Sequence, residues 1–179
     1  MENINNALIK NLFDKKIEDI QNIKNNIAIT QICESVIIKS KTDPFNIPNN
    51  LKEKKIIYIF KLLNNNANQQ ILDSFKKFKD SKQLATCKIN NSKLSTKYLY
   101  VGSCKDISSR IKQHLGIKQH EKTYALYLSK WWDYSKFGNL QIDFYEIATN
   151  SQEGLQICED LLWDYFNPLL GKKGSNNKA

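Results

Sequence analysis

Apolar residues in the first forty positions recur at intervals of three to five residues, which is the spacing of one face of a helix. We therefore expect one or two amphipathic helices between about residues 3 and 39. The apolar positions that carry this pattern are Ile4, Leu8, Leu12, Ile17, Ile20, Ile23 and Ile27. The next segment, SKTDPFNIPNN, contains Pro44 and Pro48 among several turn formers. A boundary is therefore expected between residues 40 and 53.

Two short runs of β-branched and aromatic residues follow, and each is typical of a buried strand. The first is KKIIYIFKLL, and the second is KYLYVGSC, whose strand-like part ends near Gly102. Between them, ILDSFKKFKD repeats its apolar residues at helical spacing within a polar stretch. We therefore interpret residues 64–96 as an insertion between two paired strands.

The C-terminal third predicts a helix, a strand and a second helix. DISSRIKQHLG carries Asp106 as a candidate N-cap and has Gly116 just past its end. LQIDFYEI alternates apolar and polar residues, as a strand covered on one face does. Asn150 stands three residues before Glu153 in a capping-box pattern, and Pro168 should end the helix that begins there.

One carboxylate of the last predicted helix lies on its apolar side. On a wheel advancing about 100° per residue, Glu159 falls in the middle of the apolar arc. That arc contains Leu155, Cys158, Leu161, Leu162, Trp163 and Phe166, whereas Glu153, Asp160 and Asp164 lie opposite. An unpaired buried carboxylate costs several kcal/mol, so Glu159 should meet a cation, a metal or a wet cleft. A position at the rim and an ion pair with a lysine are the alternatives to metal binding.

The short predicted helix presents a histidine and an arginine one turn apart. Its buried face is formed by Ile107, Ile111 and Leu115. His114 lies within that face and Arg110 flanks it. A histidine on such a face is most often a core residue, but beside an arginine it can also help to hold and neutralise a phosphate.

Length and charge narrow the class of protein. The 179 residues are enough for one main domain, and 41% hydrophobic with 25% charged residues is typical of a globular protein. The formal charge of +9 favours a polyanionic partner such as nucleic acid. A lysine-rich soluble surface without such a partner is the alternative. Arg110 is the single arginine among 27 basic residues, which suggests a site that needs a planar guanidinium.

The cysteines and the amino terminus indicate a protein of the reducing cytoplasm. Cys33, Cys87, Cys104 and Cys158 lie far apart and form neither a zinc-ligand spacing nor a CxxC pair, so we expect reduced thiols. MENINNALIKNLFDKK lacks the apolar stretch of a signal peptide, and no run is long enough to span a bilayer. We expect a cytoplasmic location.

Three motifs in order resemble the GIY-YIG nuclease family. IIYIF followed by YVG looks like the paired GIY and YIG strands, although Ile56 stands at the first glycine and the spacer between them is longer. SCKDISSRIKQHLG is similar to the stretch that carries the family's arginine and, in a subset resembling restriction enzymes, a histidine. ICEDLLWDYFNPLLGKKG resembles the closing helix with its metal-binding glutamate. The resemblance covers about residues 54–178.

The resemblance implies an α+β (mixed α/β) fold with a small, mainly antiparallel three-stranded central sheet flanked by helices. Residues 1–50 would then form an N-terminal helical extension of a nuclease domain spanning 54–178. The implied catalytic residues are Tyr58, Tyr100, Arg110, His114, Glu159 and Asn176, with Asn177 as the alternative asparagine. Glu159 would hold one Mg²⁺ or Mn²⁺ per active site. Implied DNA contacts come from Lys105, Lys112, Lys172 and Lys173.

The roles that the resemblance implies are those of phosphodiester hydrolysis. Arg110 would bind the non-bridging oxygens and Tyr58 would orient or deprotonate the attacking water. Tyr100 and His114 would position the phosphate or relay a proton. The chain most resembles a stand-alone type II restriction endonuclease of a restriction-modification system, acting on double-stranded DNA, with a homodimer as one expected assembly. The alternatives are a structure-specific repair or recombination nuclease, a catalytically inactive DNA-binding module, and a protein-interaction domain with a basic surface.

Overall fold

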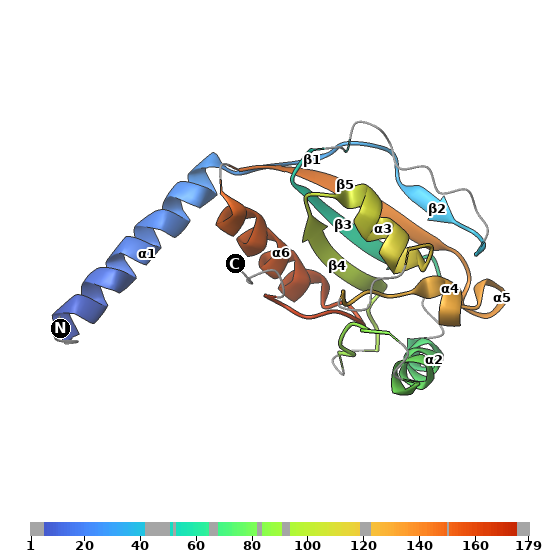
Figure 1. Ribbon diagram of the computed structural model, residues 1–179. Helices are drawn as coiled ribbons and strands as arrows, with labels where there is room; N and C mark the ends of the chain where they lie inside the picture. The colour runs from blue at the N-terminus through green and yellow to red at the C-terminus, as the bar shows by residue number, and fades with distance from the viewer. Residues whose placement is uncertain are drawn as a thin grey trace.

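The protein has an α+β fold in which helices cover both faces of a five-stranded antiparallel sheet (Figure 1). The computed structural model describes residues 6–41, 51, 53–64, 68–81, 84–90, 94–118, 123–149 and 151–174. The strands are β1 (Ala28–Gln31), β2 (Val36–Ile38), β3 (Ile56–Leu62), β4 (Tyr98–Cys104) and β5 (Leu140–Ala148). The helices of this part are α1 (Asn6–Asn26), α2 (Asn68–Asp80), α3 (Ile107–Leu115), α4 (Leu128–Trp131), α5 (Tyr134–Phe137) and α6 (Gln152–Phe166).

The sheet is wider than the sequence predicts. β3 lies between β4 and β5, and these three strands form the expected antiparallel centre. β1 and β2 extend the sheet because both pair with β5. The prediction of helix up to residue 39 is therefore wrong after Asn26. The β-branched residues of β1 and β2 also fit a helical spacing, but they cover the backbone edge that β5 would otherwise expose.

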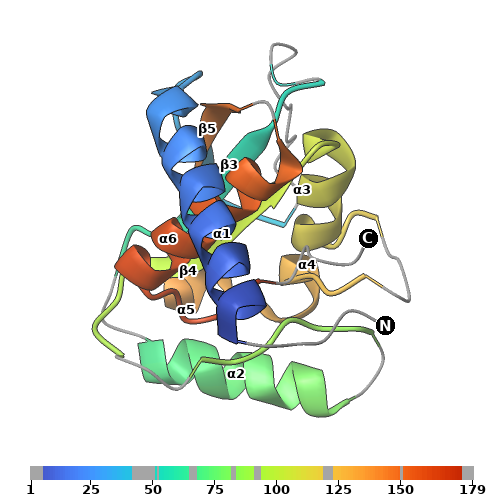
Figure 2. The same ribbon diagram turned by 90° about the vertical axis from the view of Figure 1, so that its left-hand side faces the viewer.

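Alternate side chains of β3 belong to two hydrophobic cores, one on each face of the sheet. Tyr58 and Phe60 point into the larger core, beneath α3 and the segment around α4, whereas Ile57 and Ile59 point toward α6. Figure 2 shows the sheet between α6 and α3. β5 places Leu140, Ile142 and Phe144 in the larger core, as its alternation predicts, but α6 also covers the second face near Ile147.

The helix signals of the sequence are confirmed in most details. Asp106 caps α3 by accepting a hydrogen bond from the Ser109 amide, and Gly116 ends that helix in the left-handed conformation. The capping box predicted at Asn150 is wrong, since Ser151 is the N-cap of α6 and accepts from the Gly154 amide. Asn150 itself lies outside the described residues. Leu161, placed on the apolar arc by the wheel, is 62% exposed.

A buried ion pair ties the β1–β2 segment to the sheet. Asp143 on β5 is 2% exposed and forms an ion pair with Lys61. Its carboxylate also accepts hydrogen bonds from Ser35 Oγ at 2.6 Å and from Gln141 Nε2 at 2.7 Å. Because each oxygen of the buried charge has a partner, its desolvation cost is offset.

Two further expectations concern the cysteines and the membrane. The four cysteines are free thiols, as predicted. No described helix combines the length and the apolar character that a bilayer crossing requires.

Candidate active site

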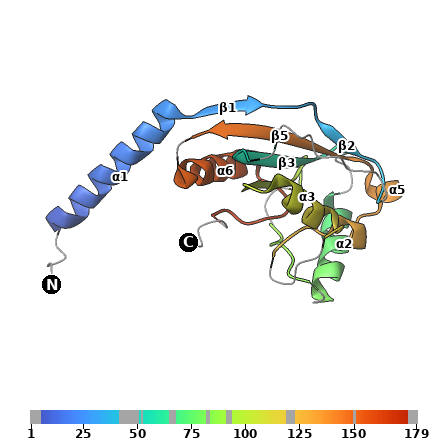
Figure 3. The ribbon, with the colours of Figure 1, turned by 45° about the horizontal axis from the view of Figure 1, so that its top comes forward.

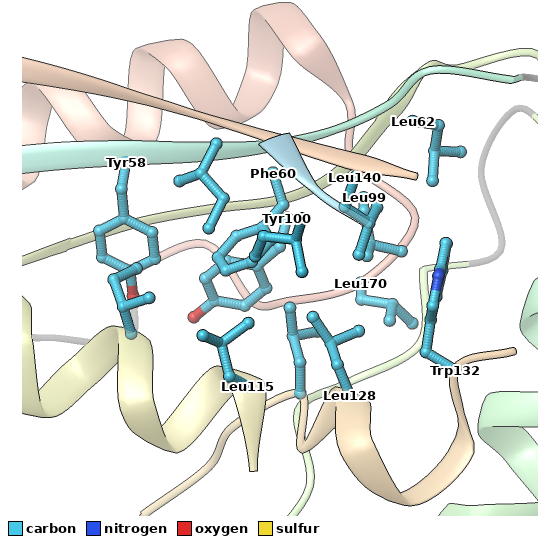
Figure 4. Packing of buried hydrophobic residues seen from close by; sticks show 14 of the residues in the cluster. Tyr58, Phe60, Leu62, Leu99, Tyr100, Leu115, Leu128, Trp132, Leu140 and Leu170 are labelled. Atoms are coloured by element: carbon cyan, nitrogen blue, oxygen red, sulfur yellow. The ribbon is translucent and has the colours of Figure 1, made fainter. Parts of the chain in front are cut away.

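Two tyrosines from adjacent strands lie side by side beneath helix α3. Tyr58 of β3 pairs with Gly102 of β4, and Tyr100 pairs with Phe60. The two phenol rings are stacked, with centroids 6.1 Å apart and planes inclined by 15°. Figure 4 shows both rings extending from the sheet toward the helix that contains Leu115. The strand register therefore places the two hydroxyl groups at the same face of the sheet.

Gly102 makes room for this arrangement. A Cβ atom at this position would lie 2.7 Å from the Tyr58 hydroxyl oxygen and 2.7 Å from Cε1 of Tyr100. Both distances are far shorter than van der Waals contact. Any side chain at residue 102 would therefore displace the phenols.

Helix α3 delivers the guanidinium of Arg110 to both phenols. Its Nε donates to the Tyr58 hydroxyl oxygen at 3.1 Å, and one terminal nitrogen donates to the Tyr100 hydroxyl oxygen at 3.3 Å. The other terminal nitrogen donates to Gln113 Oε1 at 3.3 Å. Three nitrogens in one plane thus bond three oxygens, which an ammonium group on a flexible stem cannot reproduce. Arg110, the single arginine of the chain, thus makes contacts that depend on the planar shape of its guanidinium.

His114 donates a hydrogen bond to the same Tyr58 oxygen. Its Nδ1 accepts from the Leu126 amide at 3.2 Å, so in the neutral ring the proton resides on Nε2. Nε2 lies 2.9 Å from the Tyr58 hydroxyl oxygen. Burial, with the charge of Arg110 adding to it, lowers the pKa of His114 well below its ordinary value, which keeps the ring neutral. Tyr58 Oη therefore accepts from Arg110 and His114, and its own proton is left for a third partner.

Burial and charge act in opposite directions on the phenols. Burial raises the pKa of Tyr58 well above its ordinary value and that of Tyr100 to about 12, while the positive charge of Arg110 opposes both shifts. Burial would lower the pKa of Arg110, but the adjacent phenol oxygens outweigh burial and raise it. Arg110 is therefore always charged, and an additional positive charge near the phenols would favour their ionisation.

Glu159 reaches the site from α6 on the other face of the sheet. Its side chain is 2% exposed, and Ser103 Oγ of β4 donates to Oε2. Burial raises the pKa of Glu159 to about 7, whereas the Ser103 hydrogen bond and the charge of Arg110 lower it. The Glu159 charge in turn helps to raise the pKa of Tyr100 and of Cys104. Glu159 and the cluster of Arg110 and Tyr100 therefore influence each other's pKa values across β4. β4 is the edge strand of the sheet.

The donor set near Glu159 fits a hydrated divalent cation. In the described ranges, no group of three or more His, Cys, Asp or Glu side chains is arranged to hold a metal. Mg²⁺ commonly retains several waters and uses one or two carboxylates together with substrate oxygens. One turn before Glu159, buried Gln156 has an Oε1 atom without a hydrogen-bond partner in that part of the chain. A buried carboxylate with an unused amide oxygen one turn away on the same helix suits a cation that keeps most of its own water.

The remaining predicted residues are not gathered at this cluster. Lys105, Lys112, Lys172 and Lys173 are exposed, and Lys173 forms an ion pair with Asp164. A cavity of about 560 Å³ adjoins the start of α3 and is lined by Glu53, Lys54, Lys55, Lys105, Asp106, Ile107 and Ser108. The asparagines proposed from the resemblance, Asn176 and Asn177, lie outside the described residues.

Four contributing residues were not identified from the sequence. Gly102 and Ser103 directly follow the second tyrosine motif, so the motif itself was a signal for both. Gln113 lies three residues after Arg110 on one helix face, which is a further signal. No signal in the sequence pointed to the Leu126 amide, because a backbone group from another segment becomes a partner of His114 only in the folded chain.

No family model, curated protein or solved structure matches this chain.

Gly102→Ala is expected to lower the free energy of unfolding by about 1–3 kcal/mol, because the added methyl group forces both phenols to move. Urea denaturation measures the loss. In the double variant Gly102→Ala/Tyr58→Phe, the clashing hydroxyl is gone, so its destabilisation should be smaller than the sum of the two single effects. Strict additivity would show that residue 102 does not control the position of Tyr58.

Glu159→Gln should change how stability depends on pH in protein free of divalent cations. The Glu159 pKa is about 7 in the folded protein, against 4.5 for an ordinary glutamate. The unfolded chain thus ionises first as pH rises, and wild-type stability falls by roughly 2–3 kcal/mol between pH 5 and 8. The neutral glutamine lacks this loss, so the variant should gain on the wild type over that range. Equal pH profiles of urea unfolding would contradict the raised pKa.

Proposed function

We propose that the protein is a divalent-metal-dependent DNA endonuclease of the GIY-YIG kind. The observation that carries the proposal is the cluster in which Arg110 binds both Tyr58 and Tyr100 while the buried carboxylate of Glu159 acts on it from the other side of the edge strand. The proposal is supported by the contacts among Tyr58, Tyr100, Arg110 and His114, and by the bond of Glu159 to Ser103 on the other face of the edge strand. A purely structural core would need neither the half-buried Arg110 bonded to two phenols nor the buried carboxylate of Glu159.

The chain's own groups suit the handling of a phosphodiester. Arg110 has five N–H donors, of which three serve Tyr58, Tyr100 and Gln113, leaving two for the non-bridging oxygens of a phosphate. The Tyr58 oxygen accepts from Arg110 and His114, and among the described residues no acceptor for its own proton is found. That proton can orient an attacking water or the phosphate. In this role His114 is a positioning donor to Tyr58.

Glu159, with Gln156 beside it, would hold one Mg²⁺ or Mn²⁺. When bound, the cation would supply Lewis-acid stabilisation of the phosphoryl and leaving oxygens, and its charge would favour ionisation of Tyr58. Protonation of Glu159 competes with cation binding, and the Glu159 pKa of about 7 places that competition near neutral pH.

Double-stranded DNA is the proposed substrate, and a type II restriction endonuclease is the proposed kind of enzyme. The formal charge of +9 supports a polyanionic partner. Lys105 and Lys112 are exposed at the start and in the middle of α3, and Lys172 is exposed after Pro168. These lysines can contact the DNA backbone on either side of the tyrosine cluster.

Purified protein should cut plasmid DNA when Mg²⁺ or Mn²⁺ is added. Glu159→Ala should abolish cutting while DNA binding, measured by gel shift, is largely retained. Arg110→Lys should lower the cleavage rate by about 10²–10³-fold, because lysine cannot bond both phenols and a phosphate. Glu34→Ala, at an exposed glutamate of the β1–β2 connection, is the matched control and should cut normally.

The products separate the alternatives. Discrete double-strand fragments support a restriction enzyme, and sequencing their ends would give the site and the cut position. Cleavage confined to forked or nicked DNA would replace that assignment with a structure-specific repair nuclease. DNA that stays intact with every divalent metal tested would refute the nuclease and favour a DNA-binding or protein-interaction module.

A further inference from the structure

One buried amide has a nitrogen without a hydrogen-bond acceptor, and it lies beside Arg110. The described residues include four buried side-chain amides, namely those of Asn68, Asn90, Gln113 and Gln156. Three of them donate from the amide nitrogen to an oxygen of the chain. The exception is Gln113, whose Oε1 accepts from Arg110 at 3.3 Å while no described residue accepts from its Nε2. Because buried donors are normally bonded, this nitrogen calls for an acceptor from outside the chain.

Arg110 determines which way the Gln113 amide is turned. A guanidinium only donates hydrogen bonds, so the amide atom that faces it must be the oxygen. The guanidinium is itself fixed by its bonds to Tyr58 and Tyr100. The amide nitrogen shares a carbon atom with that oxygen, so its two N–H groups lie beside the guanidinium.

The Gln113 nitrogen is accessible to solvent. In the part of the chain that the structure describes, the enclosed side-chain atoms without a hydrogen-bond partner belong to Asn68, Gln156 and Trp163. Nε2 of Gln113 is therefore not enclosed, although the residue as a whole is only 8% exposed. Helix α3 runs along the outside of the molecule, over one face of the sheet (Figures 1 and 3). A small ligand can thus reach this donor from solvent.

Gln113 holds Arg110 without cancelling its charge. The three hydrogen-bond acceptors of the guanidinium are the phenol oxygens of Tyr58 and Tyr100 and the amide oxygen of Gln113. All three are uncharged groups at neutral pH. A glutamate in place of Gln113 would accept the same bond but would form an ion pair with the guanidinium. The amide therefore leaves the positive charge available to an anion.

We infer that Gln113 Nε2 and the two unused N–H groups of Arg110 bind the non-bridging oxygens of one phosphate group. Both groups offer donors and a positive charge but no acceptor on this side, so the ligand must be an anion with several oxygens. The inference rests on the proposed function for the source of the phosphate, a DNA backbone. The recognition of the anion itself follows from the donors.

The single arginine of the chain makes this contact observable by NMR. The lysine-rich surface also attracts phosphate, so the measurement has to report on this site alone. In protein labelled with ¹⁵N in arginine and glutamine, Arg110 gives one Nε–H signal, and Gln113→Met identifies the Gln113 amide signals by removing them. Inorganic phosphate, titrated into the metal-free full chain, should shift the signals of both residues together.

Substitutions of Gln113 separate its donor from its charge. Gln113→Met has a similar length and lacks the amide, so it should bind phosphate about tenfold more weakly, the effect of one hydrogen bond to a charged acceptor. Gln113→Glu keeps an acceptor for Arg110 but adds a negative charge, so it should abolish measurable binding. The matched control is Gln70→Glu, the same change at an exposed residue of α2, and it should bind like the wild type.

The Arg110 signal without phosphate shows whether the guanidinium stays in place. If this signal is unchanged in Gln113→Met while phosphate affinity falls, the loss belongs to the missing Nε2 donor. If it has moved, the Gln113 amide signals of the wild type decide. A shift at saturating phosphate supports direct contact, whereas unmoved amide signals would show that Gln113 only positions Arg110 and would overturn the inference.

The outcomes distinguish this inference from the nuclease proposal. Phosphate-dependent shifts of Arg110 and Gln113 in a protein that cuts no DNA would support the anion site and refute the nuclease. Unchanged phosphate affinity in Gln113→Met, in a protein that cuts DNA, would overturn the role of Gln113 alone. With Ca²⁺ in place of Mg²⁺, the affinity for a short DNA duplex should fall in Gln113→Met and fall further in Gln113→Glu. Equal duplex affinity in all three proteins would exclude DNA as the source of the phosphate.

Discussion

The hydrogen bonds from Arg110 to two phenol oxygens are the interaction on which the rest of the site depends. They require Tyr58 and Tyr100 on neighbouring strands in one register, a glycine between them and a helix that starts shortly after β4. A buried guanidinium would be costly without these acceptors. In return, the fixed positive charge opposes the rise in the phenol pKa values that burial produces. The contacts that hold Arg110 in place therefore also set the pKa values of the two phenols.

Glu159 and Trp163 differ from Arg110, because the contacts of the free protein compensate their burial less completely. The carboxylate is buried with a pKa raised to about 7, and the indole N–H has no partner in the described residues. Both lie on the side of α6 that faces the edge strand, one turn apart. Buried polar groups that lower the stability of the free chain are typical of a site built for a ligand.

The N-terminal segment links the sheet to the surroundings of the molecule. β1 and β2 close the edge of β5, and the buried Asp143 with Lys61 and Ser35 keeps this segment in place. α1 then leaves the sheet with its apolar side exposed. The segment thus completes the sheet at one end and exposes apolar side chains of α1 at the other.

The sequence by itself determined strands β3, β4 and β5, helices α2, α3 and α6, and the tyrosines, arginine, histidine and glutamate of the site. Helical and alternating patterns are local, so Asp106, Gly116 and Pro168 marked helix ends, and the wheel placed Glu159 and His114 inward before any contact was known. Only the tertiary structure decided that residues 28–31 and 36–38 form strands, because their pairing depends on an edge more than a hundred residues away. The tautomer of His114, the close approach of Gly171 to the Tyr100 ring and the bond between Ser103 and Glu159 were likewise decided there. Each depends on atoms from distant segments, and no periodicity along the chain encodes their meeting.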